Sequence, residues 1–397
     1  MTQADPNSAP PVDRVASRGR WMLATSVLVA AAVLAGGEMA ARRYLVTFRE
    51  SFEKPYVSSE RVQFVTDDMV TAPPPPDLPE LLVIGNSHTY GRPGRQRGDP
   101  VQLNGGQVLP HDLWLGLRDS HPDLRLDCVL LSYPNFLPYE MLIRTAQLLQ
   151  SGHRPRVVVL GISFRNIERD SQLRDTVRDL LRDDELRDKL ETWLGSDDGP
   201  DVKKIQTALR ADSARVSSKI EAERTRSLAD RWDARLTDWV RGKFELLGRG
   251  ARLRGQILTD YVLPLQTLFF RENVETMSYD LIESDYQFNR QCLSALLRML
   301  KQNGATVVCY YAPERPDTPR LTDTAQQAAF CQDFEQEAAA LGAVVLDARA
   351  VVPEECWGWT NLTRDRSHFQ EEGHRLLARF IIEQMERHDL WSRLESK

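Results

Sequence analysis

Two segments near opposite ends of this 397-residue chain hold the residue types of a nucleophilic catalytic triad. Ser87 lies in the segment GNSHTYG, directly after the apolar run LLVIG. A serine hydroxyl is a poor nucleophile unless a base removes its proton, so a histidine has to come from elsewhere in the chain. The segment DRSHFQEEGH supplies Asp365 and, three residues later, His368. We expect His368 to be the base and Asp365 to orient its imidazole ring, both on a turn that leads into a helix.

Each of these segments also has a plain structural interpretation. A serine after a strand commonly caps a helix or a turn, and Asp365 with His368 is also typical of the residues that start a helix. The helix predicted to follow, from 370 to 387, holds a second histidine, His374, which we interpret as a packing or surface residue. Either segment alone is weak support for catalysis, and the two together are far more specific.

The elements that must position these residues are predicted from the pattern of apolar side chains. Continuous apolar runs, which suit strands buried on both faces, cover 81–85, 126–134, 156–163, 305–313 and 343–348. Helical segments are predicted at 137–151, 284–303, 323–341 and 370–387. This alternation predicts an α/β fold: a three-layer αβα, flavodoxin-like parallel sheet covered by helices on both faces. Ser87 would lie at the carboxyl edge of the sheet, where open α/β folds place their ligands.

Residues 171–255 differ from the rest of the chain because they are rich in both acidic and basic side chains. Leucines and tryptophans recur among these charges at helical spacing, so we predict amphipathic helices rather than disorder. We interpret the segment as a helical insertion or cap, with a partner-binding or membrane-facing surface as the alternative. The catalytic domain would then consist of 80–170 and 256–390.

The N-terminal residues predict a membrane anchor in front of this domain. A polar tail, 1–20, carries three arginines and precedes the uncharged segment WMLATSVLVAAAVLAGG, so we predict an uncleaved transmembrane helix over 21–42. A cleaved signal peptide and a buried core helix are the alternatives. Residues 43–79, which include TAPPPPDLPE, would form an extended stalk. We expect the domain to be exported to the periplasm or the cell surface.

The composition excludes several classes of protein. With 51 basic and 57 acidic residues and a formal charge of −6, the chain has no global electrostatic reason to bind nucleic acid. Its 42% hydrophobic content excludes a fully disordered chain and a polytopic membrane protein. The five cysteines are scattered singly, without the spacing of a zinc site. For Cys331 and Cys356, a disulfide bridge and two free thiols both remain open.

Taken together, GNSHT at the start of the domain and DRSHFQEEGHRLLA at its end resemble the SGNH (GDSL-like) hydrolase superfamily. The resemblance covers about 80–170 and 257–390. It implies that Ser87 is the nucleophile and that Asp365 and His368 complete the triad. It also implies an active site without a metal and without a cofactor.

The sequence departs from this family at three places. Asn86 stands where the family usually has an aspartate before the serine. The segment SYPNF after the second strand lacks the glycine whose amide usually joins the oxyanion hole, so Asn135 or a nearby amide would have to serve. After the third strand, GISFRN has Ser163 where the family's asparagine is expected and Asn166 three residues later. The implied oxyanion donors are therefore the Ser87 amide and Asn166, which we prefer over Ser163, with Asn135 as a further candidate.

Two more residues are candidates for contact with the substrate. His88 lies beside the nucleophile, and it would either touch the substrate or, in our preferred interpretation, support the site from behind. Arg315 follows the fourth predicted strand at the same edge of the sheet. It would contact an anionic or sugar substrate, and an ordinary loop arginine is the equal alternative.

The resemblance implies a membrane-anchored serine esterase or O-acyltransferase that acts on acyl esters of cell-envelope glycans through an acyl-serine intermediate. Similar membrane-tethered proteins commonly work beside a polytopic membrane acyltransferase, which would be the partner here. The alternative is a non-catalytic SGNH-like protein that binds or scaffolds envelope polysaccharide machinery. Asn86 and the altered middle motifs favour this alternative, whereas the intact Ser87, Asp365 and His368 favour the enzyme.

Overall fold

The computed structural model describes residues 28–29, 31–40, 62–64, 78–90, 109–133, 135–168, 171–195, 200–224, 236–237, 239, 243, 281–316, 324–359 and 364–395. They belong to two compact units. One unit is formed by Met1–Glu50 with Ser227–Leu258, and the other by Ser51–Arg226 with Thr259–Lys397. The second unit contains the sheet and the candidate site.

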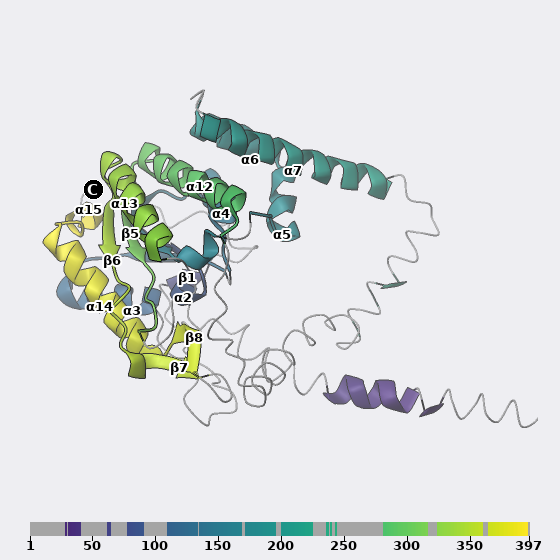
Figure 1. Ribbon diagram of the computed structural model, residues 1–397, viewed down its shortest axis with the longest axis horizontal. Coiled ribbons are helices and arrows are strands. Elements are labelled where there is room, and N and C mark those ends of the chain that lie inside the picture. The colour runs from purple at the N-terminus through teal and green to yellow at the C-terminus, as the bar shows by residue number, and fades with distance from the viewer. Residues whose placement is uncertain are drawn as a thin grey trace, which may run out of the picture. The chain divides into compact units, whose positions relative to one another are not determined.

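The second unit is built on a six-stranded sheet in which every pairing is parallel (Figure 1). Its strands, in chain order, are β1 (Val62–Phe64), β2 (Glu80–Gly85), β3 (Asp127–Ser132), β4 (Pro155–Ile162), β5 (Thr306–Tyr311) and β6 (Val344–Asp347). In space they follow the order β1-β3-β2-β4-β5-β6. After β2, the chain therefore adds β3 on one side of β2 and then β4 on the other side. The predicted α/β parallel sheet is confirmed.

Helices cover both faces of this sheet, as predicted. One face packs against α4 (Pro138–Gln150), α12 (Glu283–Gln302) and α13 (Thr324–Ala340), and the other against α3 (Leu109–Ser120) and α14 (Glu371–Arg387). Within β2, Leu82 and Ile84 belong to the first core, whereas Leu81 and Val83 belong to the second. All four side chains are buried, because a central parallel strand faces a helical layer on each side.

One part of the predicted stalk belongs to the sheet. Residues 62–64 form β1, which pairs with β3 in the register Val62–Cys128, so the stalk prediction over 43–79 is wrong for these residues. A strand of three residues is too short to leave a recognisable pattern of alternation in the sequence. The proline run of the predicted stalk lies outside the described residues.

The charged segment forms helices that pack onto the sheet's helical layer. These are α5 (Asp175–Arg178), α6 (Asp184–Leu194) and α7 (Pro200–Arg224), with a 3₁₀ turn, η2 (Asp179–Arg182), between the first two. Leu190 of α6 and Ile205 and Leu209 of α7 are buried in the same core as α4 and α12. The predicted amphipathic helices are thus confirmed over 175–194 and 200–224, whereas most of 225–255 lies outside the described residues. Their buried apolar side chains pack in the core that α4 and α12 form with the sheet.

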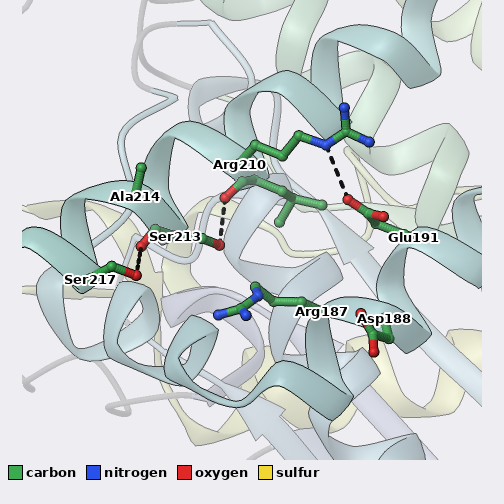
Figure 2. Close-up of a pocket in the computed structure, with 8 residues that line it drawn as sticks. Arg187, Asp188, Glu191, Arg210, Ser213, Ala214 and Ser217 are labelled. Atoms are coloured by element: carbon green, nitrogen blue, oxygen red, sulfur yellow. Dashed lines mark hydrogen bonds and ion pairs between the residues drawn. The ribbon is translucent and has the colours of Figure 1, made fainter.

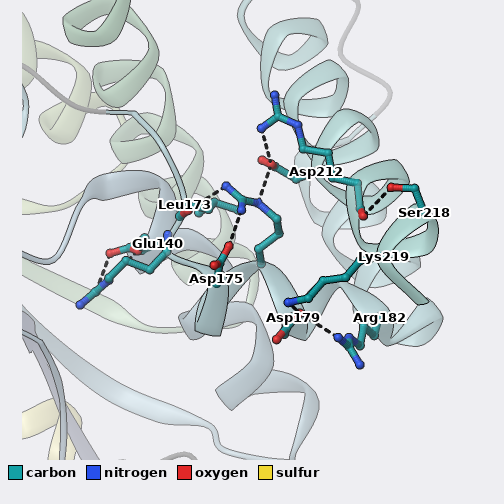
Figure 3. A network of polar contacts seen from close by, with 11 residues as sticks. Glu140, Leu173, Asp175, Asp179, Arg182, Asp212, Ser218 and Lys219 are labelled. Carbon is teal, nitrogen blue, oxygen red and sulfur yellow. Dashed lines mark hydrogen bonds and ion pairs between the residues drawn. The ribbon is translucent and has the colours of Figure 1, made fainter. Parts of the chain in front are cut away.

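Polar contacts reinforce this attachment (Figure 3). Asp212 of α7 is buried, and its carboxylate accepts hydrogen bonds from Arg178 Nε at 3.0 Å and from Tyr139 Oη, on α4, at 3.4 Å. The carboxylate of Glu140, also on α4, is fully buried and binds the Arg174 guanidinium at the start of α5. Both buried carboxylates are therefore paired, which offsets the free-energy cost of burying their charge.

In the first unit, residues 28–29 and 31–40 are helical. Their large apolar side chains Leu28, Val29, Val33, Leu34 and Met39 are exposed. Among the described residues, none of the helices combines the length and the apolar character that a membrane crossing requires. The tail 1–20 and both ends of the predicted anchor lie outside the described residues.

The cysteines form no disulfide bridge. All five are buried free thiols, so the alternative of a bridge between Cys331 and Cys356 is wrong. Burial raises the pKa of both thiols. These side chains therefore stay protonated and act as small apolar groups in the core.

Candidate functional site

The segment with the predicted nucleophile lies where the sheet reverses its order. β2 ends at Gly85, and the single-turn helix α2 (Ser87–Tyr90) begins two residues later. Because β3 lies on one side of β2 and β4 on the other, α2 starts at the topological switch point, where ligands bind in open α/β sheets. The side chain of Ser87 lies outside the described part of the chain, but its backbone is at the predicted edge.

Asn86 fixes the backbone on both sides of Ser87. Its side-chain oxygen accepts a hydrogen bond from the His88 backbone N–H at 3.0 Å, which caps the start of α2. Its carbonyl oxygen accepts hydrogen bonds from the Thr89 N–H at 3.0 Å and from the Ser132 hydroxyl at 2.8 Å. An aspartate at this position would use its carboxylate for the same cap. The amide oxygen of Asn86 makes the contact without burying a charge.

The two C-terminal candidates lie on a strand rather than on a turn. A two-stranded antiparallel hairpin is formed by β7 (Trp357–Trp359) and β8 (Arg364–Phe369), and β8 contains both Asp365 and His368. The predicted turn is therefore wrong. Between the paired positions Trp357–Phe369 and Trp359–Arg364, β8 carries three more residues than β7, so the hairpin is bulged. A bulge re-aims side chains and is frequent beside active sites.

The fold brings α2 and β8 into contact, although they come from opposite ends of the sequence. The ring centroids of His88 and His368 are 6.4 Å apart, and the rings are tilted by 47°. His88 also stacks on Phe369, with the centroids 6.3 Å apart and the planes 7° apart. The residue after Ser87 thus faces the predicted base. The side chain of Asp365, like that of Ser87, is outside the described part.

A third imidazole lies behind this pair. His374, in the first turn of α14, is 1% exposed, and its ring centroid is 4.3 Å from that of Phe369. Neither ring nitrogen has a hydrogen-bond partner among the described residues. Burial, followed by the charges of His368 and His88, lowers the pKa of His374 from 6.5 to about 3. His374 is therefore a neutral packing residue at physiological pH, the first of the two predicted roles.

The glycine of the EEGH segment explains how α14 starts so close to β8. A Cβ atom added at Gly373 would lie 2.8 Å from Cβ of Phe369, closer than real side-chain contacts allow. Only a glycine lets the helix begin against this ring. Gly373 therefore helps to fix Phe369, and through it the position of His88.

The predicted oxyanion residues follow β3 and β4 at the same edge of the sheet. Asn166 ends the 3₁₀ turn η1 (Phe164–Asn166) after β4, and its Nδ2 donates a hydrogen bond to the Phe136 carbonyl at 3.0 Å. A side-chain amide carries two N–H groups, so a second one remains for another acceptor. Ser163 precedes this turn and is half-buried. Asn135 is exposed and has a φ of 51°.

These hydrogen bonds connect the loops of three neighbouring strands. Ser132 ties the end of β3 to Asn86, and Asn166 ties the loop after β4 to the loop after β3. Arg315, the other predicted substrate contact, is half-buried in the loop after β5. The preceding residue, Glu314, donates its backbone N–H to the carbonyl of Arg349 after β6. The contacts of Arg315 and His88 with substrate stay predictions.

Sequence reasoning missed the residues that support the site. Neither the Ser132 hydroxyl nor Tyr310, whose hydroxyl is 2.7 Å from that of Thr89, was singled out in the sequence. Thr89 belongs to the GNSHT segment, and it is fully buried. A buried hydroxyl needs a hydrogen-bond partner. The partner itself is 221 residues away, so no local pattern identifies it.

Two pockets in the described part of the chain lie between pairs of helices. One, of about 230 Å³, lies between α6 and α7, where Arg210 is paired with Glu191 at 3.2 Å (Figure 2). The other, of about 480 Å³, lies between α3 and α14. Neither is lined by a predicted site residue. Within the described ranges, no group of three His, Cys, Asp or Glu side chains could hold a metal ion.

No protein-family model matches the sequence, and a comparison with curated proteins gives no match. Similar solved structures include Axe2, an acetylxylan esterase from Geobacillus stearothermophilus, at 12% identity over 77% of this chain and 94% of that chain, with a TM-score of 0.36. LAE5, an α/β hydrolase enzyme from the metagenome of Lake Arreo, Spain, is 12% identical over 77% and 93%, with a TM-score of 0.37. TesA is 13% identical over 77% and 97%, with a TM-score of 0.35. At these TM-scores, the function has to be argued from the residues of the chain itself.

Proposed function

We propose that this chain is an SGNH-type serine esterase or O-acyltransferase in which Ser87 is the nucleophile and His368 is the base. The observation that carries the proposal is the contact between α2 and β8 at the carboxyl edge of the sheet. There the ring of His88, the residue next to Ser87, is 6.4 Å from the ring of His368. A nucleophile and a base have to meet in this way, and residues so distant in sequence do so only through the fold.

The proposed reaction has two steps. In the first, the Ser87 hydroxyl attacks an ester carbonyl while His368 takes its proton and then gives it to the departing alcohol. Asp365 holds the imidazole in the required tautomer. In the second step, water or a sugar hydroxyl attacks the acyl-Ser87 carbonyl while His368 takes its proton. His368 then gives that proton to the Ser87 oxygen as the acyl–serine bond breaks, which releases a carboxylic acid or an acylated sugar and restores free serine. Water makes the protein an esterase, and a sugar hydroxyl makes it an O-acyltransferase.

The oxyanion of each tetrahedral intermediate needs hydrogen-bond donors. We assign this role to the backbone N–H of Ser87 and to the second N–H of the Asn166 side chain, with Ser163 and Asn135 as the further candidates. The hydrogen bond from Asn166 to the Phe136 carbonyl supports the assignment, because it fixes the orientation of the amide. One such donor is worth about 10²–10³ in rate.

The hydrogen bonds of Asn86 favour the enzyme over a non-catalytic binding or scaffold protein. Asn86 in place of the family's usual aspartate is one of the features that favour a scaffold. Asn86 caps α2 through its amide oxygen, and its carbonyl accepts hydrogen bonds from Ser132 and Thr89. The turn between β2 and α2 is therefore held without a carboxylate. A turn fixed by these hydrogen bonds would hold Ser87 in one position, as a nucleophile requires.

The cellular setting belongs to the same proposal. The uncharged segment after the arginine-bearing tail supports a membrane anchor, and the exposed Leu28, Val33 and Leu34 are compatible with one. We place the catalytic domain outside the cytoplasm, acting on acylated cell-envelope glycans beside a polytopic membrane acyltransferase. A reporter enzyme fused after residue 397 should then be active only outside the cytoplasm. Activity confined to the cytoplasm would contradict export.

A fluorophosphonate probe tests the nucleophile directly, because it reacts covalently with activated serines. We expect the full-length protein to be labelled and Ser87→Ala to lose labelling. The matched control is Ser151→Ala, at the end of α4, which should be labelled like the wild type. An unlabelled wild type, or equal labelling of Ser87→Ala, rules out this nucleophile. Acyl transfer to a glycan acceptor, compared with hydrolysis, then separates the transferase from the esterase.

A further inference from the structure

A single buried hydrogen bond joins α2 to the middle of the sheet. The hydroxyl oxygens of Thr89, on α2, and Tyr310, on β5, are 2.7 Å apart. Both residues are fully buried. In the sheet, β4 lies between β2 and β5, so the Tyr310 side chain has to pass over β4 to reach α2.

Two glycines make room for this bond. A Cβ added at Gly85, the last residue of β2, would lie 1.9 Å from the Thr89 hydroxyl oxygen. A Cβ added at Gly161, on β4, would lie 2.5 Å from the Tyr310 oxygen and 2.8 Å from the Thr89 oxygen. Gly161 is also the register partner of Tyr310. Both neighbouring strands thus lack a side chain at the place where the two hydroxyls meet.

The Thr89–Tyr310 bond complements the contacts of Asn86. Asn86 holds the start of α2 from the β3 side, through Ser132, and caps the helix at His88. Thr89 holds the same turn from the β5 side. Ser87 lies between these two attachments. Burial raises the pKa of Tyr310, so its hydroxyl stays protonated and can serve the bond at every working pH.

We propose that Tyr310, acting through Thr89, is a positioning residue that sets the place of Ser87 relative to His368. This inference rests on the proposed function. It extends the site to β5, a strand that contributes no residue to the predicted triad. The Tyr310 hydroxyl does not touch the reacting atoms, and its effect is exerted through the position of α2.

The test compares two tyrosines that are neighbours on β5. Tyr310→Phe removes the hydroxyl bonded to Thr89, whereas Tyr311→Phe removes a hydroxyl that donates to the Cys331 carbonyl of α13 at 3.1 Å. With p-nitrophenyl acetate and the full-length protein, Tyr310→Phe should lower kcat about 10- to 100-fold and leave KM within about twofold, as a misplaced nucleophile does. Tyr311→Phe should keep the wild-type kcat.

Substitutions at Thr89 complete the comparison. Thr89→Val removes the hydroxyl with little change of shape and should lower kcat as Tyr310→Phe does. Thr89→Ser keeps the hydroxyl and should restore most of the activity. The inference is overturned if Tyr310→Phe lowers only the melting temperature, or if Tyr311→Phe lowers kcat by the same factor.

Hydrogen exchange separates this inference from the proposed function. The Thr89 N–H donates to the Asn86 carbonyl, so a loosened α2 should exchange faster in peptides that cover 85–90. We expect faster exchange in Tyr310→Phe and unchanged exchange in Tyr311→Phe, whether or not the protein hydrolyses the ester. Failure of Ser87 labelling counts against the proposed function alone. Unchanged exchange in Tyr310→Phe counts against the role of Tyr310.

Discussion

His374 is a buried imidazole whose charge the fold controls. The unfolded chain takes up a proton at this residue as the pH falls below about 6.5, whereas the folded protein resists protonation until about pH 3. Its contribution to stability is therefore present above pH 6.5 and is lost as the pH falls toward 3. From this residue alone, the free energy of unfolding should drop by about 2–3 kcal/mol between pH 7 and pH 4.5.

The substitution His374→Leu should remove that part of the pH dependence, because leucine cannot be protonated. Urea denaturation at pH 7 and pH 4.5 measures the difference between the two free energies of unfolding. The matched control is His388→Leu, an exposed histidine after the same helix, which should keep the wild-type pH dependence. A pH dependence unchanged by His374→Leu would show that the pKa of His374 is the same in the folded protein as in the unfolded chain, and would contradict the effect of burial.

At the residue scale, candidate reacting groups can be proposed from the sequence, whereas the residues that support them cannot. Ser87 and His368 could be proposed as a pair because Ser87 follows the apolar run LLVIG and His368 precedes a predicted helix. A serine hydroxyl also needs an imidazole base to become a nucleophile. The hydrogen bond from the Ser132 hydroxyl to the Asn86 carbonyl and the contact between the Thr89 and Tyr310 hydroxyls could not be foreseen. Both contacts join residues of different strands or loops, and such contacts leave no periodic trace in the chain.

At the scale of elements, the start of α14 and the hairpin depend on each other through Gly373. In Gly373→Ala, the new Cβ meets the Cβ of Phe369, so the ring stacked on His88 has to move. We expect kcat for p-nitrophenyl acetate to fall by about tenfold or more. Gly116→Ala is the matched control, because its Cβ meets only the flexible end of Ile382, and it should keep the wild-type kcat.

The inserted helices provide a second prediction at this scale. Leu209 of α7 is 3% exposed in the core that it shares with α4 and α12. Leu209→Ala should lower the free energy of unfolding by about 2–5 kcal/mol, measured by urea denaturation. Thr207→Ala, on the exposed side of the same helix, should change it little. An unchanged main transition in Leu209→Ala would mean that α7 is not part of the domain's core.

Five strands of the sheet could be predicted because each contains a continuous apolar run, and the central ones are buried between two helical layers. The hairpin of β7 and β8 could not, since RDRSHF is mostly charged or polar and shows no alternation. Helix α3 was also missed. Its sequence contains Pro110 and Gly116, residues that are more typical of turns than of helix interiors.

At the scale of the whole molecule, the sheet order puts the site at the reversal between β2 and β4, and it makes β1 the edge strand beside β3. A chain that starts at residue 78 would lack β1 and expose the backbone groups along the edge of β3. Such an edge pairs readily with another chain. In size-exclusion chromatography, we expect this chain to elute at a larger apparent mass than one that starts at residue 51. Identical elution would contradict a structural role for β1.

The class of fold could be predicted from the alternation of elements, but the place of β1 could not. An edge strand of three residues is specified by its partner rather than by its own sequence. The same holds for the proximity of α2 and β8, which follows from the sheet order and the hairpin together. Pairings between residues so far apart in sequence leave no local pattern that could predict them, and they are the slowest to form.

The order of the elements along the chain also separates the two proposed reacting groups, Ser87 and His368, during synthesis. α2 comes early in the catalytic unit, whereas β8 is the last strand in the described part of the chain. During translation, the serine therefore leaves the ribosome long before the histidine. With His368 as the base, an unfinished or C-terminally clipped polypeptide would carry a serine with no partner to activate it. The proposed ester chemistry would then begin only after the segment that holds His368 has been made and has folded.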